Sequence, residues 1–343
     1  MNTLKKIDYL PFLEACWQEH LQPKPDNAPT VISLFAGCGG SSLGYSMAGF
    51  RELLANEWDD NACQTFSLNF PDVPMINGDI AKLTIDEILR VTGLQPGELD
   101  ILDGSPPCQG FSTAGKRQLD DPRNQLFREY VRILRGLKPK VFVMENVSGM
   151  VKGVMKLVFV EILKELKASE YKVSARLLNA MYFNVPQSRQ RMIFIGVRDD
   201  LGIEPSHPKA ESVPVILRDA LLSVPDGLRM NNMFGKQKVI ANQMKPGQSG
   251  ADILGHGKWF THRKFELDKC AKTIQREAWQ FYHPDRSEPF SITELMRLFS
   301  YPDSFNLLGT WGEASSRLGN SVPPLFMRSI ARHIKQEILK VTV

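Results

Sequence analysis

The feature that most constrains the fold is an alternation of short apolar runs with helical segments, which begins at Val31. The strand-like runs VISLF, ELLAN, PMING, LDILDGS and VFVMEN are each followed by a segment with helical spacing, such as SSLGYSMAGF or NQLFREYVRILRGL. Strands that alternate with helices favour a parallel sheet with helices on both faces. The sequence therefore predicts a doubly wound α/β fold.

The later part of the chain has a different pattern. Two strand-like runs, YKVSARLLNA and RMIFIGVR, follow one another without a helix, so the sheet is expected to end in an antiparallel pair. Residues from about 204 are rich in Pro, Gly, Asn, Gln, Lys and His and have weak periodicity, which indicates a smaller lobe. The predicted segments are an N-terminal extension over 1–29 with a helix near Tyr9–His20, a large domain over 30–203, a small lobe over 204–290, and a C-terminal segment over 291–343.

Composition excludes some classes of protein. The 42 Lys and Arg residues slightly outnumber the 38 Asp and Glu residues, which permits a polyanionic partner without requiring one. Five scattered cysteines with no CxxC pair argue against a disulfide framework and against a zinc site, and no metal is expected. Since no run of about 18 apolar residues occurs, neither a membrane span nor a signal peptide is expected, and we predict a cytoplasmic protein.

A glycine-rich turn follows the first strand. In VISLFAGCGGSSLGY, Gly37 and Gly39 allow the backbone to pass close to a ligand, and Ser41 or Ser42 is placed to cap the next helix. The dinucleotide pattern GxGxxG is incomplete, because Ser42 stands where its third glycine would fall. A tight turn that only packs a strand on a helix is the alternative.

Acidic and aromatic residues follow the next two strands. Glu57 stands about twenty residues after the turn, where an acid can hydrogen-bond ribose hydroxyls. Trp58 is placed to stack on adenine, and Asp79 is placed to bind the adenine amino group. These residues predict an adenosine cofactor but do not distinguish NAD from S-adenosylmethionine.

Cys108 follows the strand LDILDGS, and this places it at the sheet edge where open α/β folds bind ligands. Pro106 and Pro107 stiffen the backbone before it, although a lone cysteine is more often a small buried hydrophobe. The next strand ends in Glu145 and Asn146. Because neighbouring strand ends lie about 5 Å apart, Cys108 and Glu145 are expected to face one pocket.

Three polar side chains enter the last strand at alternate positions. In VPQSRQRMIFIGV these are Gln187, Arg189 and Arg191, and alternation places all three on one face. We expect this face to bring guanidinium groups to the same edge of the sheet as the thiol. The alternative is an ordinary solvated face.

Five ordered motifs carry a family resemblance. FAGCGG, SPPCQGFS, MENV, QSRQR and RLGNSVPP match, in order and spacing, the blocks of DNA (cytosine-5) methyltransferases of the bacterial or phage, restriction-modification-like type. The resemblance spans residues 31–197 and 287–339. It implies a Rossmann-like, S-adenosylmethionine-dependent sheet with a smaller target-recognition lobe, and it implies that the segment over 291–343 returns to complete the large domain.

The resemblance also implies roles for individual residues. Cys108 would add to cytosine C6, Glu145 would hold N3 and the exocyclic amine, and Arg191 would bind the base carbonyl with support from Arg189. S-adenosylmethionine, which becomes S-adenosylhomocysteine, would be bound at Phe35, Gly37, Gly39, Glu57, Trp58, Asp79, Ile80, Asn320 and Val322.

Methylation of a base within double-stranded DNA requires that the base is flipped out of the stack. The segment QGFSTAGKRQLDDPRN directly after Cys108 has the composition of a mobile loop that closes over DNA. The predicted DNA contacts are Gln109, Ser112, Lys116, Arg117, Lys258 and Arg263. A cognate restriction endonuclease is the expected functional partner, and the chain is expected to be a nucleoid-associated monomer.

Three alternatives stay open. A tRNA cytosine-5 methyltransferase of the same fold is disfavoured because the small lobe has no Cys-Phe-Thr element, Cys270 being followed by Ala271 and Lys272. An NAD-dependent oxidoreductase leaves Cys108, Glu145 and Arg191 unexplained. A silent DNA-binding half of a two-chain enzyme is disfavoured because one chain holds all the chemical residues. The DNA recognition sequence cannot be read from the chain.

Overall fold

The computed structural model describes residues 4–107, 122–151, 155–230, 233, 235–255, 257 and 259–341. The chain divides into two compact units, and both are discontinuous in sequence. Unit 1 comprises Met1–Gln18, Asn179–Arg189 and Ala210–Phe326, and unit 2 comprises Glu19–Leu178, Gln190–Lys209 and Met327–Val343. Residues 291–326 therefore group with unit 1, and only the last part of the predicted return segment groups with the sheet.

Unit 2 is built on a seven-stranded sheet with the strand order β3-β2-β1-β4-β5-β8-β6. The neighbours from β3 to β5 pair in parallel, and β8 runs antiparallel to β5. This confirms the doubly wound fold, and the antiparallel strand β8 lies next to the edge strand β6, so the two last predicted strands are neighbours. The strands are β1 (Thr30–Leu34), β2 (Arg51–Glu57), β3 (Met75–Asn77), β4 (Ile101–Gly104), β5 (Val141–Val147), β6 (Tyr171–Asn179) and β8 (Gln190–Arg198).

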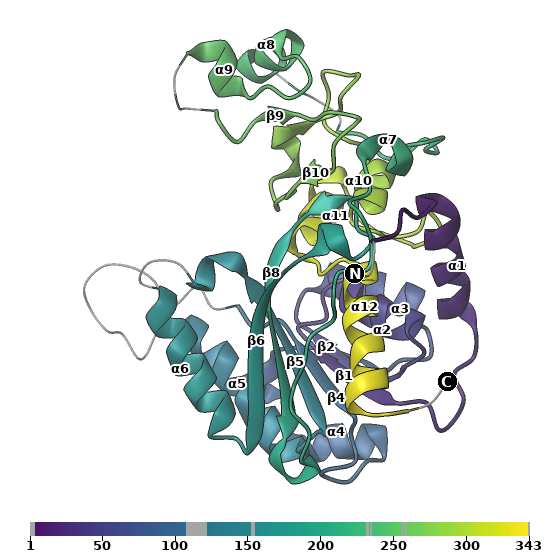
Figure 1. Cartoon of the computed structure of the whole chain (residues 1–343), viewed down its shortest axis with the longest axis vertical. Helices are drawn as coiled ribbons and strands as arrows, with labels where there is room; N and C mark the ends of the chain where they lie inside the picture. The colour runs from purple at the N-terminus through teal and green to yellow at the C-terminus, as the bar shows by residue number, and fades with distance from the viewer. Residues whose placement is uncertain are drawn as a thin grey trace. The chain divides into compact units, whose positions relative to one another are not determined.

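Helices cover both faces of this sheet (Figure 1). One face packs against α4 (Ile85–Thr92), α5 (Pro122–Leu137) and α6 (Met155–Lys167). The other face carries α2 (Gly40–Met47), α3 (Asp60–Asn69) and α12 (Pro324–His333), which continues as a π-helical turn over Ile334–Ile338. Lys335 Nζ donates to the Ala48 carbonyl at the end of α2, which fixes the C-terminal helix on this face.

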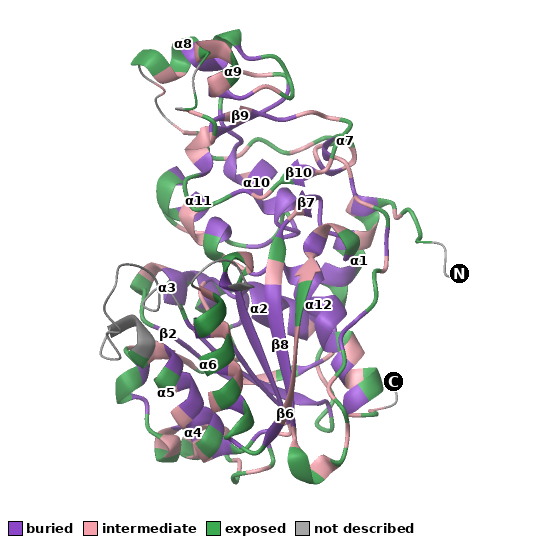
Figure 2. Cartoon of the chain, turned by 60° about the vertical axis from the view of Figure 1, so that its left-hand side comes forward, coloured by how far each residue is buried: buried purple, intermediate pink, exposed green. Residues whose placement is uncertain are grey.

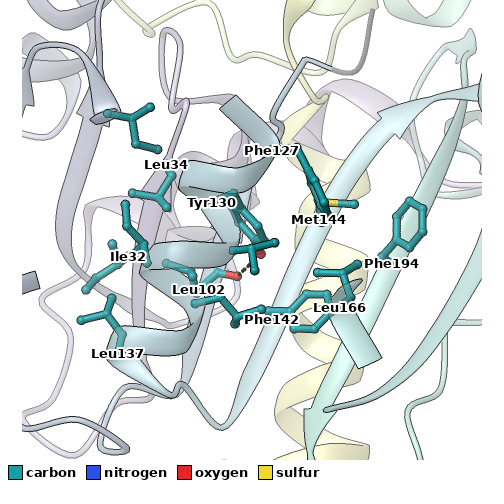
Figure 3. Packing of buried hydrophobic residues seen from close by; sticks show 14 of the residues in the cluster. Ile32, Leu34, Leu102, Phe127, Tyr130, Leu137, Phe142, Met144, Leu166 and Phe194 are labelled. Atoms are coloured by element: carbon teal, nitrogen blue, oxygen red, sulfur yellow. Dashed lines mark hydrogen bonds between the residues drawn. The ribbon is translucent and has the colours of Figure 1, made fainter. Parts of the chain in front are cut away.

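The main hydrophobic core lies between the sheet and α5 and α6 (Figure 3). Phe142 and Leu102 project from β5 and β4 onto Tyr130 of α5, whose hydroxyl donates to the Leu102 carbonyl at 3.4 Å. Burying each such large apolar side chain stabilises the fold by about 1.5–3 kcal/mol. Figure 2 shows the inner strands, such as β8, mainly buried and the edge strand β6 only partly buried, while α4 and α6 carry exposed residues on their outer sides.

Side-chain caps set several helix ends. Asp59 accepts from the Ala62 backbone at the start of α3, and Thr84 does the same for Glu87 at the start of α4. The prediction that Ser41 or Ser42 caps α2 is wrong: the cap residue is Gly39, which makes no side-chain hydrogen bond. Both serines are buried, and Ser42 instead donates to Glu52 of β2 at 3.0 Å.

Unit 1 is made of short elements with long connections, which explains its weak periodicity. It starts with most of α1 (Tyr9–Leu21), the helix predicted near the N-terminus, and is held by paired short strands and an aromatic cluster around Tyr282. Its other elements are β7 (Gln187–Ser188), β9 (Arg263–Lys264), β10 (Ala271–Lys272), β11 (Phe281–Tyr282), α7 (Leu217–Ala220), α8 (Gly235–Gln243), α9 (Gly250–Leu254), α10 (Ile292–Leu298) and α11 (Trp311–Asn320). In the part of the chain that the structure describes, every helix is too short or too polar to span a membrane.

Candidate active site

The glycine turn after β1 is closed by backbone hydrogen bonds and by an acid from β2. Gly39 N–H donates to the Ala36 carbonyl at 3.0 Å, and Gly37 N–H donates to Glu57 Oε2 at 2.9 Å. Gly37 and Gly39 have φ values of 55° and 92°, in the left-handed region that favours glycine. A Cβ at Gly39 would lie 2.5 Å from the Phe70 ring, whereas one at Gly37 would meet open space. The turn therefore leaves room for a ligand beside Gly37.

The carboxylate of Glu57 organises the end of β2. Its Oε1 accepts from the backbone N–H groups of Trp58 and Asp59 at 2.8 and 3.1 Å, and the residue is only 8% exposed. A carboxylate offers about four acceptor positions, so Glu57 keeps capacity for a ribose hydroxyl. Trp58 is 76% exposed beside it, an unusual position for a large aromatic side chain.

The loop after β3 joins the same region. Gly78 N–H donates to the Glu57 carbonyl at 2.8 Å, which brings this loop beside the acid. Asp79 is exposed and accepts from the Ala81 backbone at 3.0 Å, while Ile80 is buried. Phe35, with a φ of 56°, is partly buried at the start of the glycine turn. The structure therefore gathers the predicted cofactor residues of unit 2 around the carboxyl ends of β1, β2 and β3.

The chain segment before the predicted nucleophile is anchored by the neighbouring strand β5. Strand β4 leads to Pro106 and Pro107, the last residues described before Cys108, which itself lies outside the described residues. Asn146 Nδ2 donates to the Pro106 carbonyl at 3.2 Å, and its Oδ1 accepts from Val147 N–H at 2.9 Å. Both ends of the amide are used, so the side chain fixes the backbone two residues before Cys108.

Glu145 and Arg191 form an ion pair at the same edge of the sheet. Arg191 Nε lies 2.6 Å from Glu145 Oε1, with side-chain exposures of 12% and 10%. The two residues come from the antiparallel strands β8 and β5, where Val147 is registered opposite Arg191. Because little water reaches this ion pair, the attraction between its two charges is stronger than it would be in water. The structure thus brings together two of the predicted catalytic side chains.

The prediction that Gln187, Arg189 and Arg191 project to one face is wrong. The strand is interrupted at Arg189, between β7 and β8. Arg189 lies in unit 1, whereas Arg191 lies in unit 2 and pairs with Glu145. Gln187 Nε2 donates to the Leu298 carbonyl at 3.2 Å, and Arg189 is fully buried against backbone carbonyls of unit 1. Strict alternation fails because Gln187 and Ser188 pair with another segment, β10, and are not part of the seven-stranded sheet.

The other predicted site residues are distributed as follows. Asn320 and Val322 lie in unit 1, where Asn320 ends α11 with its side chain exposed and Val322 is buried. Arg263 begins β9 and is partly buried. The remaining predicted DNA contacts, and the predicted mobile loop, lie outside the described residues: Gln109, Ser112, Lys116, Arg117 and Lys258.

A buried acid was missed in the sequence. Asp103 of β4 is 3% exposed and accepts from the Tyr45 hydroxyl of α2 at 3.1 Å. Burial raises its pKa to about 7, although hydrogen bonds from Tyr45 and Ser41 oppose the shift and Glu145 adds to it. Glu52 lies in the same polar cluster, and burial raises its pKa to about 8. An acid inside the short, otherwise non-polar strand sequence ILDG is the signal that could have identified Asp103.

No group of metal-ligating side chains occurs among the residues with described positions. The strand order and the glycine turn define a Rossmann-like methyltransferase fold. The same fold is found in a crystal structure described as a DNA modification methyltransferase encoded within an E. coli prophage, with a TM-score of 0.75 and 24% identity over 91% of this chain and all of that one. The S. pombe Dnmt2 methyltransferase has a TM-score of 0.65 and 19% identity over 92% of this chain and all of its own.

The chain belongs to the C-5 cytosine-specific DNA methylases, whose family pattern it matches over residues 29–336. It is 34% identical to the Type II methyltransferase M1.HphI of Haemophilus parahaemolyticus, over 89% of this chain and 86% of that protein. It is 30% identical to M.NgoPII of Neisseria gonorrhoeae, over 93% of this chain and 99% of that protein. The protein is therefore a DNA cytosine-5 methyltransferase, and the oxidoreductase alternative is excluded.

Proposed function

We propose that the protein transfers a methyl group from S-adenosylmethionine to C5 of a cytosine flipped out of a specific double-stranded DNA sequence, through a covalent bond between Cys108 and C6. The observation that carries this proposal is the Glu145–Arg191 ion pair beside the Asn146–Pro106 hydrogen bond. These contacts place an acid, a cation and the backbone leading to a thiol at one edge of the sheet.

Cytosine C5 is a weak nucleophile, so the ring must first be activated. The Cys108 thiolate adds to C6 and the ring electrons move toward N3, which makes C5 nucleophilic. Asn146 supports this step because it holds the Pro106 carbonyl and so restricts the backbone that carries the thiol. After the methyl group is on C5, the C5 proton leaves and the C6–sulfur bond breaks, which regenerates the thiolate.

Glu145 and Arg191 would act on opposite parts of the base. The Glu145 carboxyl holds a proton at N3 and accepts from the exocyclic amine, so negative charge does not accumulate on the ring. The Arg191 guanidinium donates to the base carbonyl. Their mutual ion pair keeps both side chains in place before the base enters.

Residues in and beside the glycine turn fit an adenosine cofactor. Glu57 has acceptor capacity for ribose hydroxyls, Trp58 offers an exposed ring to adenine, and the space beside Gly37 admits a ligand. Phe35, Asp79 and Ile80 complete this part of the site, and the family resemblance implies cofactor contacts for Asn320 and Val322 as well. S-adenosylmethionine supplies an electrophilic methyl group when bound.

DNA would be held by cations and by the segment after Cys108. Lys116 and Arg117, and Lys258 and Arg263 in the small lobe, would contact phosphates, which gives affinity without sequence choice. Because the curated relatives are Type II methyltransferases, we infer that the protein protects DNA against a cognate restriction endonuclease. We further infer that it acts as a cytoplasmic, nucleoid-associated monomer.

The test is methyl transfer from labelled S-adenosylmethionine to mixed-sequence DNA and, separately, to tRNA. The expected result is label on cytosine C5 of DNA, with none transferred by the Cys108→Ala variant. Label on tRNA alone, or on the N4 amine of cytosine, would overturn the proposal. Base-resolution methylation sequencing of DNA from cells that express the protein would then identify the recognition sequence.

A further inference from the structure

Arg189 is the largest fully buried side chain of the described chain. A guanidinium keeps its charge at any physiological pH, and burying that charge is costly unless strong acceptors surround it. The acceptors that the fold supplies therefore indicate what the residue does.

Two of these acceptors lie on either side of Asn320. Arg189 Nη2 donates to the Gly319 carbonyl at 2.6 Å and to the Ser321 carbonyl at 3.1 Å. Its Nη1 donates to the Ile274 carbonyl at 3.0 Å, and the guanidinium lies 5.3 Å from the centre of the Phe299 ring. One side chain thus fixes the backbone before and after Asn320.

The same guanidinium ties this turn to a neighbouring segment. The Gly319 backbone lies so close to residues 275–276 that an added Cβ would be 2.6 Å from the Arg276 backbone. Gln187 reinforces the contact, because its Oε1 accepts from Ile274 N–H at 3.1 Å. The turn is consequently rigid on its buried side, while the Asn320 side chain is exposed.

We propose that Arg189 is a positioning residue for methyl-donor binding: it holds the Gly319–Ser321 turn so that Asn320 is presented to S-adenosylmethionine. This inference rests on the proposed cofactor role of Asn320. It replaces the supporting role beside Arg191 at the base carbonyl that the resemblance implies for Arg189, since the guanidinium is buried on the carbonyls of its own unit.

The Arg189→Lys variant tests the proposal, because an ammonium keeps the charge but cannot bridge separated carbonyls with a planar fork. Arg297→Lys is the matched control: Arg297 is also buried in unit 1 and donates to the Leu222 carbonyl, but it does not contact the turn. The measurement is the dissociation constant for S-adenosylmethionine without DNA, by calorimetry, at a temperature where circular dichroism shows both variants folded.

We expect Arg189→Lys to weaken S-adenosylmethionine binding about tenfold or more, and Arg297→Lys to leave it within about twofold. Adding Asn320→Ala to Arg189→Lys should cause little further loss, because both changes remove one presented side chain. If Arg189→Lys does not fold, Gly319→Ala displaces the same turn and should give the same defect.

Wild-type affinity in folded Arg189→Lys, or fully additive losses in the double variant, would overturn the positioning role. Failure of the wild-type protein itself to bind S-adenosylmethionine would instead overturn the proposed function. A loss of turnover in Arg189→Lys with unchanged cofactor affinity would point to the supporting role at the base carbonyl and against positioning of Asn320.

Discussion

Glu145 and Arg191 meet at 2.6 Å across two antiparallel strands, β5 and β8, at the carboxyl end of β5. The pair is about nine-tenths buried, so each charge depends on the other before any base binds. If a flipped cytosine binds both side chains, hydrogen bonds to the polar edge of the base would replace part of the contact between the two charges. The position of the acid and the position of the cation therefore depend on each other.

Glu145→Gln keeps the shape of the side chain but removes its charge and its ability to hold a proton for N3. We expect the methyl-transfer rate to fall about 100-fold or more, while S-adenosylmethionine affinity stays within about twofold. Single-turnover transfer to DNA checks the first value and calorimetry checks the second. A rate within about threefold of wild type would remove Glu145 from the chemistry.

Asn146→Asp removes one of the two hydrogen bonds of this side chain and keeps the other. The remaining oxygen can still accept from Val147 N–H, but the donor to the Pro106 carbonyl is lost and two oxygens face each other. We expect the rate of covalent adduct formation to fall about tenfold to 100-fold, with little change in cofactor affinity. The rate of adduct formation should fall less in Asn146→Ala, which lacks the repulsion between the two oxygens. Equal rates for both variants and wild type would show that the Pro106 contact does not position the nucleophile.

Asp103→Asn should change how stability depends on pH. The native-state pKa of Asp103 is raised to about 7, against an ordinary value of 3.8, so between these values the native state binds more protons than the unfolded state. Stability therefore falls as pH rises through this window and levels off above about pH 7. The neutral amide removes this loss. The stability of the variant relative to wild type should therefore rise by about 1–3 kcal/mol as the pH increases from 5 to 8.

Urea unfolding at pH 5, 7 and 8 measures that relative gain, with the exposed Asp72→Asn change as a control. Glu52, Tyr45 and Glu145 also face the cluster, and their charges couple to Asp103. Parallel pH profiles for Asp103→Asn and wild type would mean that Asp103 is not protonated in the native state near neutral pH.

The glycine turn gives a matched pair of substitutions. Gly39→Ala places a Cβ 2.5 Å from Phe70 at a φ of 92°, and should cost about 2–4 kcal/mol of stability. Gly37→Ala meets no neighbour within 4 Å, so it should cost only about 1 kcal/mol through its positive φ. Thermal and urea unfolding measure both, and a larger loss for Gly37→Ala would contradict this assignment of the turn.

Much of unit 2 could be predicted because its local signals agree with one another. Runs such as VFVMEN are fully buried strands, and the helices between them have clear apolar faces, so period and length identify each element. Strand polarity alone predicted that the ends of β4 and β5 meet at one edge of the sheet, and the Asn146–Pro106 hydrogen bond lies there. The expected pocket shared by Cys108 and Glu145 stays a prediction, because Cys108 lies outside the described residues. Unit 1 has short elements stabilised by distant contacts, and these leave little trace in a local pattern.

The errors in the predicted site have a common cause. Local rules predict Ser41 or Ser42 as a cap, but a partly buried acid on strand β2, Glu52, accepts a hydrogen bond from Ser42 instead. Arg189 reads as a member of an alternating face, but carbonyls from residues 274, 319 and 321 bind its guanidinium. In each case a partner far away in sequence determines the direction of the side chain, and no spacing rule within one segment specifies such a partner.

The central claim is that Cys108 bonds covalently to the target cytosine. The most direct measurement uses duplex DNA with 5-fluorocytosine at the target position, S-adenosylmethionine, and mass spectrometry of the digested complex. Because fluorine cannot leave as a cation from C5, the adduct should accumulate and map to the peptide that contains Cys108, with none formed by Cys108→Ala. An adduct on another residue, or methylation of ordinary DNA by Cys108→Ala, would contradict the account.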